Sequence, residues 1–390
     1  MAHCLQNRRL AAMALLMTVV LTTAGCAHNR ASTAPAKSAA ARALSSEPAT
    51  ALSTNAPSST SSPSAASQPT AQAFLARYVT VDGRVIRHDQ GGDIVSEGQA
   101  YGMLIAELAA DNATTQRIWS WTKQHLQRPD GLLSYHANGD GSVLDPQSAS
   151  DADILIAFAL LRYNGPDSSS LHADGKKVAA AVLAHETTQL PDGTPVVAAG
   201  PWAVGAVSTI DVSYWMPSVD DKLATLTGDQ KWSRAASGAI RLLQQLTDSG
   251  RQLPPDWAQL KGGALTAIAA PGGSAPVQYG LDAQRVPIWL ATSCTADATK
   301  LAAAWWTVLS VGDRATAIAL TLDGAVTNPN QNPLPPIAAA ASAQAAGDRA
   351  AATGLLDRAQ TQAAQNPTYY GDAWAVLGPA LLTGALTTCE

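Results

Sequence analysis

Hydrophobic residues recur at intervals of three and four along most of the chain after residue 70, the spacing that places them on one face of an α-helix. The segments with this spacing are 71–78, 97–110, 116–126, 151–163, 175–187, 219–226, 231–246, 282–291, 296–309, 335–345, 349–364 and 371–383. They follow one another in pairs, and the loops between them are rich in Gly, Pro and Asp. The pattern therefore predicts an all-α domain.

About twelve helices in antiparallel pairs favour an (α/α)6 toroid of helical hairpins, with a plain bundle or a solenoid as the alternatives. Short extended pieces such as 195–199 predict small β elements in the loops. In a toroid the inner helices run roughly parallel, so their N-termini gather at one end. Acidic residues that open inner helices should then face one another across a cleft.

The first 70 residues lack this pattern. Arg8 and Arg9 precede an apolar stretch at 10–21, and small residues follow it up to Cys26. This order is typical of a lipoprotein-type signal peptide over 1–25 with Cys26 as the lipidated residue, and ordinary secretion is the alternative. Residues 26–70 consist mainly of Ala, Ser, Thr and Pro, which predicts a low-complexity tether. We expect an extracytoplasmic, membrane-anchored lipoprotein, or else a secreted or periplasmic protein.

Composition narrows the function classes. Hydrophobic residues make up 46% of the 390 residues, enough for a sizeable core in 71–390. The net charge of −5 and the absence of a basic stripe argue against nucleic acid as a partner. Ten Trp and eight Tyr against two Phe favour surfaces that bind sugar rings. Cys294 and Cys389 remain in an oxidising compartment, either as a disulfide or as two buried thiols.

Acidic residues stand at the start of three predicted helices. Glu97 lies in "SEGQAYGM", Asp151 in "SASDADILI", and Asp282 in "LDAQR" three residues before Arg285. Each has a structural explanation of its own: Ser96 and Ser150 are natural N-caps, and an acid in the first turn meets the positive end of the helix dipole. Asp282 and Arg285 could likewise form a surface ion pair.

Together these elements resemble family 8 of the glycoside hydrolases. The resemblance rests on "SEGQAYGM", "IWSWTKQHLQRPDGLLSY", "DPQSASDAD" and "LDAQRVPIW" in this order, and it covers the chain from about residue 73 to its end. It implies a glycoside hydrolase catalytic domain over 71–390 on an (α/α)6 toroid. It also implies an inverting endo-β-1,4-glucanase that hydrolyses cellulose-type glucan without a cofactor or metal.

The resemblance assigns roles to individual residues. Glu97 matches the general acid, Asp282 the general base, and Asp151 the carboxylate that positions the sugar. The residues matched to substrate contacts are Arg285, Tyr214, Tyr369 and Tyr370, with Trp121 and Trp202 as weaker assignments. Two features depart from the family pattern: Leu281 stands before the base, and Asp211-Val212-Ser213 precedes Tyr214 where Asn-Pro-Ser is more usual.

The chemistry sets further expectations. An acid catalyst at a helix N-terminus needs a raised pKa, and a neighbouring Asp151 carboxylate would supply it. Gly98 and Gly102 cost helix stability, and we expect them to leave room for a passing glucan chain. The loop 138–145 resembles a calcium loop but lacks its closing glutamate, so we interpret it as a turn.

Three functions stay open on the sequence alone. The first is action on cellulose, and the second is the same mechanism on xylan, mixed-linkage glucan or chitosan. The third is a non-catalytic lipoprotein that binds exopolysaccharide. In each case the partner is a β-1,4-linked polysaccharide, with membrane contact through Cys26, and we expect a monomer.

Overall fold

A computed structural model describes residues 70–387 and 389 of the chain. The predicted signal peptide, the lipidation site at Cys26 and nearly all of the predicted tether lie outside the described residues. Within the described part no helix is both long enough and apolar enough to cross a membrane.

Twelve α-helices form in the described part of the chain, one for each segment predicted from the hydrophobic spacing. They are α1 (Ala71–Tyr78), α2 (Ser96–Leu108), α3 (Asn112–His125), α4 (Ser150–Arg162), α5 (Ser168–His185), α6 (Pro217–Thr227), α7 (Lys231–Leu246), α8 (Val286–Ala291), α9 (Ala296–Leu309), α10 (Leu334–Ala345), α11 (Arg349–Gln365) and α12 (Tyr369–Leu382).

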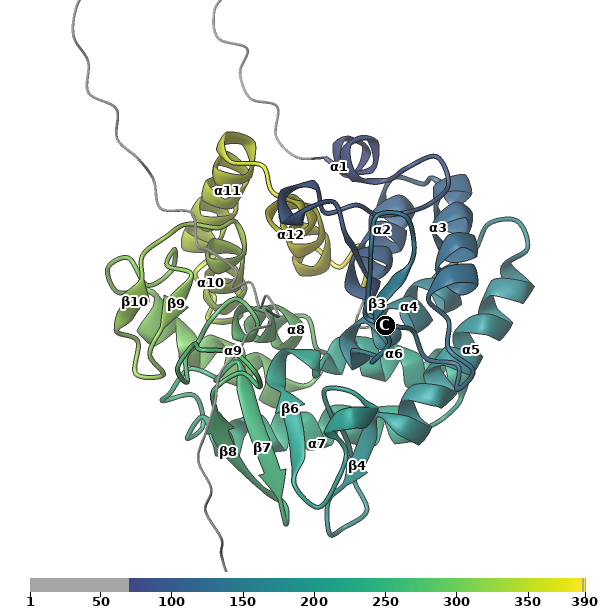
Figure 1. Ribbon diagram of the computed structural model, residues 1–390. Helices are drawn as coiled ribbons and strands as arrows, with labels where there is room; N and C mark the ends of the chain where they lie inside the picture. The colour runs from purple at the N-terminus through teal and green to yellow at the C-terminus, as the bar shows by residue number, and fades with distance from the viewer. Residues whose placement is uncertain (1–69, 388, 390) are drawn as a thin grey trace, which may run out of the picture. The chain divides into compact units, whose positions relative to one another are not determined.

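Six of these helices form an inner ring, which confirms the predicted toroid (Figure 1). Each of α2, α4, α6, α8, α10 and α12 packs against the next, and α12 packs against α2 to close the ring. The outer helices α3, α5, α7, α9 and α11 each pack against the inner helix that precedes them, and α1 packs against α12.

Burial explains which helices lie inside. In α4 every residue from Ser150 to Leu161 is buried, because an inner helix has neighbours on all sides. Alanine-rich α10 is buried from Leu334 to Ala343 in the same way. Outer helix α7 buries one face only, through residues such as Trp232 and Leu243.

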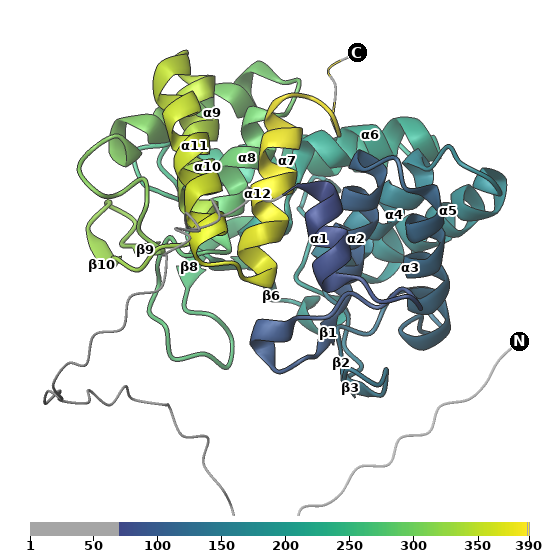
Figure 2. The same ribbon diagram turned by 90° about the horizontal axis from the view of Figure 1, so that it is seen from above.

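Short strands occupy the loops at one end of the ring (Figure 2). They are β1 (Ile94–Val95), β2 (His136–Ala137), β3 (Val143–Asp145), β4 (Thr187–Gln189), β5 (Pro195–Val197), β6 (Ser208–Asp211), β7 (Trp257–Lys261), β8 (Ala264–Ile268), β9 (Ala319–Leu320) and β10 (Val326–Asn328). The sheets have the orders β1-β2-β3, β4-β5, β6-β7-β8 and β10-β9. The extended piece predicted at 195–199 therefore forms, paired with β4.

The two expected serine N-caps are wrong. Ser96 and Ser150 are the first helical residues of α2 and α4, and the cap positions belong to Val95 and Ala149. Ser150 Oγ instead donates a hydrogen bond of 2.5 Å to the Ala198 carbonyl, beyond β5. The Ala198 carbonyl, just after β5, thus accepts the hydrogen bond from the hydroxyl that we expected to cap α4.

A disulfide joins Cys294 to Cys389, with their Cα atoms 5.2 Å apart and 95 residues apart in sequence. It links the turn between α8 and α9 to the segment that follows α12. In that segment Leu386 is 1% exposed and lies against the core. The open choice between a disulfide and two thiols is settled in favour of the disulfide.

Replacing both cysteines by serine is expected to lower the free energy of unfolding by about 2–4 kcal/mol, because the unfolded chain loses a large closed loop. Urea unfolding of the wild type and of Cys294→Ser/Cys389→Ser, each with and without reductant, checks this. Reductant should lower the wild-type midpoint and leave the variant unchanged. Equal midpoints for all four samples would contradict a stabilising role.

Candidate active site

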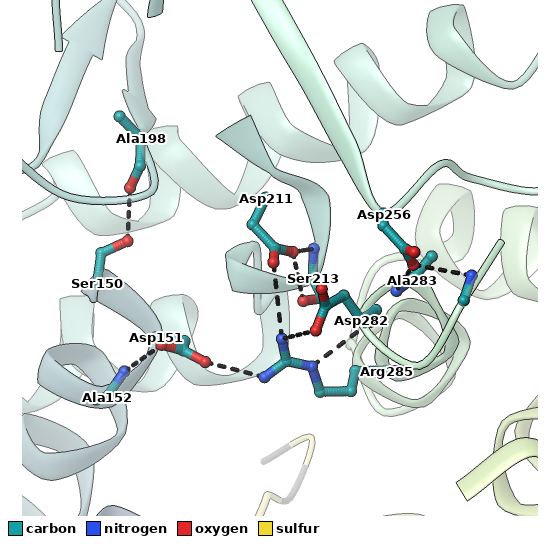
Figure 3. Close-up of polar contacts among 11 residues, drawn as sticks. Ser150, Asp151, Ala152, Ala198, Asp211, Ser213, Asp256, Asp282, Ala283 and Arg285 are labelled. Atoms are coloured by element: carbon teal, nitrogen blue, oxygen red, sulfur yellow. Dashed lines mark hydrogen bonds and ion pairs between the residues drawn. The ribbon is translucent and has the colours of Figure 1, made fainter. Parts of the chain in front are cut away.

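Arg285 lies at the centre of a cluster of carboxyl groups at the strand-bearing end of the ring (Figure 3). It is 3% exposed, and its Nη1 donates a hydrogen bond of 2.9 Å to Asp151 Oδ2. Its Nη2 donates to Asp282 Oδ1 at 3.3 Å. The structure thus brings together two acids that are 131 residues apart in sequence. A surface ion pair, the alternative considered for Arg285, is excluded by this burial.

Glu97 lies in the first turn of α2 and belongs to the same electrostatic cluster. Burial raises the pKa of its carboxyl, the charge of Arg285 opposes this rise, and the charges of Asp151 and Asp282 add to it, with the result that the pKa is raised to about 7. Asp151 therefore contributes as expected from the sequence, but desolvation is the larger cause. A carboxyl with this pKa keeps its proton in mildly acidic water and can donate it to a bound oxygen.

Asp282 differs from Glu97 in its access to water. It precedes the 3-10 turn η4 (Ala283–Arg285), and α8 begins only at Val286, so the helix predicted from 282 starts four residues later. Its side chain is 42% exposed, against 3% for the Asp151 side chain. Within the cluster, the Glu97 carboxyl therefore tends to keep its proton, whereas the Asp282 carboxyl is exposed to solvent and lies next to the Arg285 guanidinium.

Asp256 holds the backbone on both sides of Asp282. Its Oδ1 accepts hydrogen bonds from Gly280 N at 2.8 Å and Ala283 N at 2.9 Å. Burial and, to a lesser extent, the charge of Asp282 raise the pKa of Asp256 to about 6. Gly280 has no room for a side chain, because a Cβ atom there would lie 2.4 Å from Asp256 Oδ2.

Three tyrosines predicted to contact substrate lie at this cluster. The Arg285 guanidinium carbon is 5.5 Å from the centroid of the Tyr214 ring. Tyr369 opens α12 and is 2% exposed, and its hydroxyl has no hydrogen-bond partner among the described residues. Tyr370, partly exposed, is near enough to Arg285 and Glu97 for their charges to act on its hydroxyl.

The two tryptophans predicted to contact sugar differ in exposure. Trp202, in the 3-10 turn η2 (Pro201–Ala203), is 46% exposed and adjoins Gly200, which packs closely against the Ser148 carbonyl ahead of α4. Trp121 on α3 is only 6% exposed and stacks on His125 with 4.6 Å between ring centroids. Trp202 therefore offers a free ring face for a sugar, whereas Trp121 is mostly covered by protein.

The glycines of α2 have a different purpose from the one expected. A Cβ atom at Gly98 would lie 2.9 Å from the Tyr369 hydroxyl. One at Gly102 would lie 2.7 Å from Val85 Cγ2. Both glycines thus make room for side chains of this protein, and the expected passage of a glucan chain at these positions is not supported.

Sequence reasoning missed three residues of the cluster. Asp211 ends β6, and Asp256 directly precedes β7. The two strands pair with Asp211 opposite Trp257, which brings both acids to the cluster. Burial raises the pKa of the Tyr135 hydroxyl, and the nearby charges of Glu97 and Asp151 add to the rise. The available signals were the departure from Asn at 211, the "PPDW" segment ending at Trp257, and the tyrosine that ends "DGLLSY".

Two further acids are buried next to Asp151. Asp153 and Glu186 are both 0% exposed, and they accept hydrogen bonds from Leu133 N at 2.9 Å and Ser148 Oγ at 2.6 Å. Asp153 Oδ2 and Glu186 Oε2 have no partner among the described residues. Burial raises the pKa of Glu186 to about 8, and the charge of Glu186 adds to the raised pKa of Asp153. Two buried acids that act on each other's charge are stable when at least one of them is protonated.

This raised pKa predicts that stability declines with pH. Glu186 takes up its proton near pH 4.5 when unfolded and near pH 8 when folded, so its contribution is complete below about 4.5 and is lost as pH rises toward 8. Glu186→Gln should reduce the loss of unfolding free energy between pH 5 and pH 8 by at least about 1 kcal/mol. Urea unfolding at both pH values measures it, and an equal loss in the two proteins would contradict the assignment.

The described residues hold no group of three or more His, Cys, Asp or Glu side chains suited to a metal ion. The turn predicted at 138–145 covers 138–142, and residues 143–145 form β3. Asn138 N donates to the Ser142 carbonyl at 2.9 Å, and Asp140 Oδ1 accepts from Ser142 Oγ at 2.7 Å. The groups available for chemistry in the cluster are thus carboxyls, one guanidinium and phenols.

Three known proteins share the sequence or the fold. A probable endoglucanase of Novacetimonas hansenii is 34% identical over 58% of this chain and 69% of its own length. An endoglucanase of Pseudomonas fluorescens is 28% identical over 64% of this chain and 66% of its own length. The structure of the endo-β-1,4-glucanase CMCax from Acetobacter xylinum superimposes with a TM-score of 0.65 at 28% identity, over 81% of this chain and 98% of that one.

The model of the family described as glycosyl hydrolases family 8 matches residues 47–378, most of the chain. The match spans the inner helices that carry Glu97 and Asp151, the η4 turn that carries Arg285 and the loops that carry the remaining acids. With this match, the closed helical ring and the paired acids at one end of it, the chain belongs to family 8 of the glycosyl hydrolases and is a glycosidase.

Proposed function

We propose that this protein is an exported endo-β-1,4-glucanase that hydrolyses cellulose-type β-glucan with inversion at the anomeric carbon. The observation that carries the proposal is the contrast within one cluster: the pKa of Glu97 is raised to about 7, while the Asp282 side chain is 42% exposed and bound to Arg285. The names of the relatives, endoglucanases in both sequence matches described above, support the substrate class.

In this mechanism each group of the cluster has one task. Glu97 donates its proton to the leaving glycosidic oxygen, and Asp282 accepts a proton from the water that attacks the opposite face of the sugar. Asp151 accepts hydrogen bonds from sugar hydroxyls and adds to the pKa of Glu97. Arg285 fixes Asp151 relative to Asp282. Tyr214, Tyr370 and Trp202 contact the glucan, and Tyr369 and Trp121, which are both buried, are the weaker assignments.

Release of reducing ends from carboxymethylcellulose, xylan, mixed-linkage glucan and chitosan, measured in parallel, tests the function. We expect the highest rate on carboxymethylcellulose, with a rapid fall in viscosity because an endo-acting enzyme cuts within chains. A higher rate on another polymer would mean that this polymer is the substrate, and the proposed mechanism would still apply. If the wild type binds the polymer but releases no more reducing ends than Glu97→Gln does, a non-catalytic polysaccharide-binding protein is favoured.

The proposed membrane anchor depends on Cys26. Cys26→Ser should move the protein from the membrane fraction to the soluble fraction or block its processing, because the lipid-bearing thiol is lost. Cys4→Ser is the matched control, since Cys4 precedes the proposed cleavage site and should not affect anchoring. Fractionation followed by immunoblotting decides the matter. A wild-type protein found only in the soluble fraction would contradict the lipid anchor.

A further inference from the structure

Asp211 is a buried carboxyl that the proposed mechanism leaves without a task. It ends β6 and is 1% exposed. Its Oδ1 accepts hydrogen bonds from Ser213 N at 2.9 Å and Ser213 Oγ at 2.6 Å. Its Oδ2 is buried and has no hydrogen-bond partner among the described residues. One oxygen is therefore satisfied, while the other is free and enclosed.

The free oxygen faces the Arg285 side of the cluster without a close ion pair. Asp211 Oδ2 and Arg285 Nη2 are 3.9 Å apart, whereas an ionised carboxylate and a guanidinium usually approach to about 2.7–2.9 Å. Arg285 directs its hydrogen bonds to Asp151 and Asp282 instead. Figure 3 shows the same guanidinium nitrogen of Arg285 joined by dashed lines to both Asp211 and Asp282. At this separation Asp211 Oδ2 receives no hydrogen bond from Arg285 that would stabilise a charge on it.

The charges around Asp211 lead to the same conclusion. The ionisable groups near it are Arg285 in the η4 turn, Asp282 just before that turn and Asp151 of α4, which is bound to Arg285. Tyr214 follows three residues after Asp211, and Asp256 directly precedes Trp257, the residue of β7 that pairs with Asp211. Three carboxylates would share one guanidinium if Asp211 were ionised. Burial raises the pKa of Asp211 well above its usual range, the charge of Asp282 adds to the rise, and Arg285 opposes it.

We propose that Asp211 keeps a proton on Oδ2 during turnover and donates it in a hydrogen bond toward the Asp282 carboxylate, directly or through one bound water. Asp211 is then a positioning residue for the general base. It fixes the orientation of a partly exposed side chain without adding a negative charge to the cluster. This inference rests on the proposed role of Asp282 as the base.

Removing the donor is the first test. Asp211→Ala should lower kcat by about 10- to 100-fold with a small change in KM, because the lost bond involves a charged acceptor. Asp211→Asn should restore most of that loss, since an amide N–H can replace the carboxyl O–H in nearly the same shape. Asp220→Asn is the matched control: Asp220 is a buried acid of α6 with an unpartnered oxygen, and it lies outside the cluster. Unchanged kcat in Asp211→Ala would overturn the proposal.

The pH profile of kcat/KM separates a neutral Asp211 from an ionised one. If Asp211 is neutral, Asp211→Asn removes no charge, and both limbs of the profile stay within about 0.3 pH units of the wild type. If Asp211 is ionised, the variant loses a negative charge beside two catalytic acids. Both limbs then move to lower pH by about 0.5–1 unit, which would overturn the proposal.

A measurement without turnover keeps this inference separate from the proposed function. Carboxyl 13C NMR of protein labelled at Asp, recorded from pH 5 to pH 8, should contain a resonance at the position of a protonated acid. That resonance should be missing from Asp211→Asn and present in Asp220→Asn. A resonance assigned to Asp211 that titrates below pH 5 would overturn the inference, whatever polymer the enzyme cleaves.

Discussion

Glu97→Gln is expected to lower kcat on unactivated β-glucan by at least about 10²-fold, the scale of a lost general acid. Glutamine preserves the shape of the side chain but has no proton to give to the leaving oxygen. The wild type should lose activity as pH rises through about 7, because the pKa of Glu97 lies there and only its protonated form is competent. The variant should lack this alkaline limb.

Two controls distinguish a chemical loss from a damaged fold. A β-glucoside substrate with a dinitrophenolate leaving group needs little protonation, so Glu97→Gln should retain much of the wild-type rate on it. The melting temperature should change little, since a neutral carboxyl is replaced by an amide of the same size. Near wild-type turnover on cellulose oligomers would mean that Glu97 only caps α2.

The helical framework was predictable because its determinant is local. An inner or outer helix buries apolar residues at a spacing of three and four, and every segment with that spacing became a helix. The positions of Glu97 and Asp151 at helix starts were predictable for the same reason, since parallel inner helices place their N-termini together. The resemblance added the roles, which no periodicity contains.

The parts that could not be predicted depend on contacts between distant segments. Ser150 caps no helix because the Ala198 carbonyl takes its hydroxyl. Gly98 makes room for Tyr369, which is 271 residues further along the chain. Asp211 and Asp256 reach the cluster only because β6 pairs with β7. The spacing of hydrophobic residues along the sequence contains no information about such pairings.

Asp282→Asn is expected to abolish measurable turnover, a loss of at least about 10²-fold, because water loses the carboxylate that would accept its proton. The substitution should change the free energy of unfolding by less than about 0.5 kcal/mol. The reason is that the side chain is 42% exposed and only one of its oxygens contacts Arg285, at 3.3 Å. Circular dichroism and thermal melting of the variant check that the loss is chemical. A variant that melts normally and still turns over would remove Asp282 from the mechanism.

The stereochemistry of the wild-type reaction decides which role Asp282 has. An inverting enzyme keeps its two carboxyls about 6.5–9.5 Å apart to admit a water, whereas a retaining one brings them to about 5–5.5 Å for direct attack. Glu97 is on α2 and Asp282 precedes α8, two elements on different parts of the inner ring, and the exposure of Asp282 leaves it open to water. We therefore expect α product first from a β-linked oligomer, in proton NMR spectra recorded before mutarotation. Azide should not give a retained glycosyl azide with Glu97→Gln, because no covalent intermediate exists to be intercepted. If β product accumulates first, Asp282 is a nucleophile and the water-activating role fails.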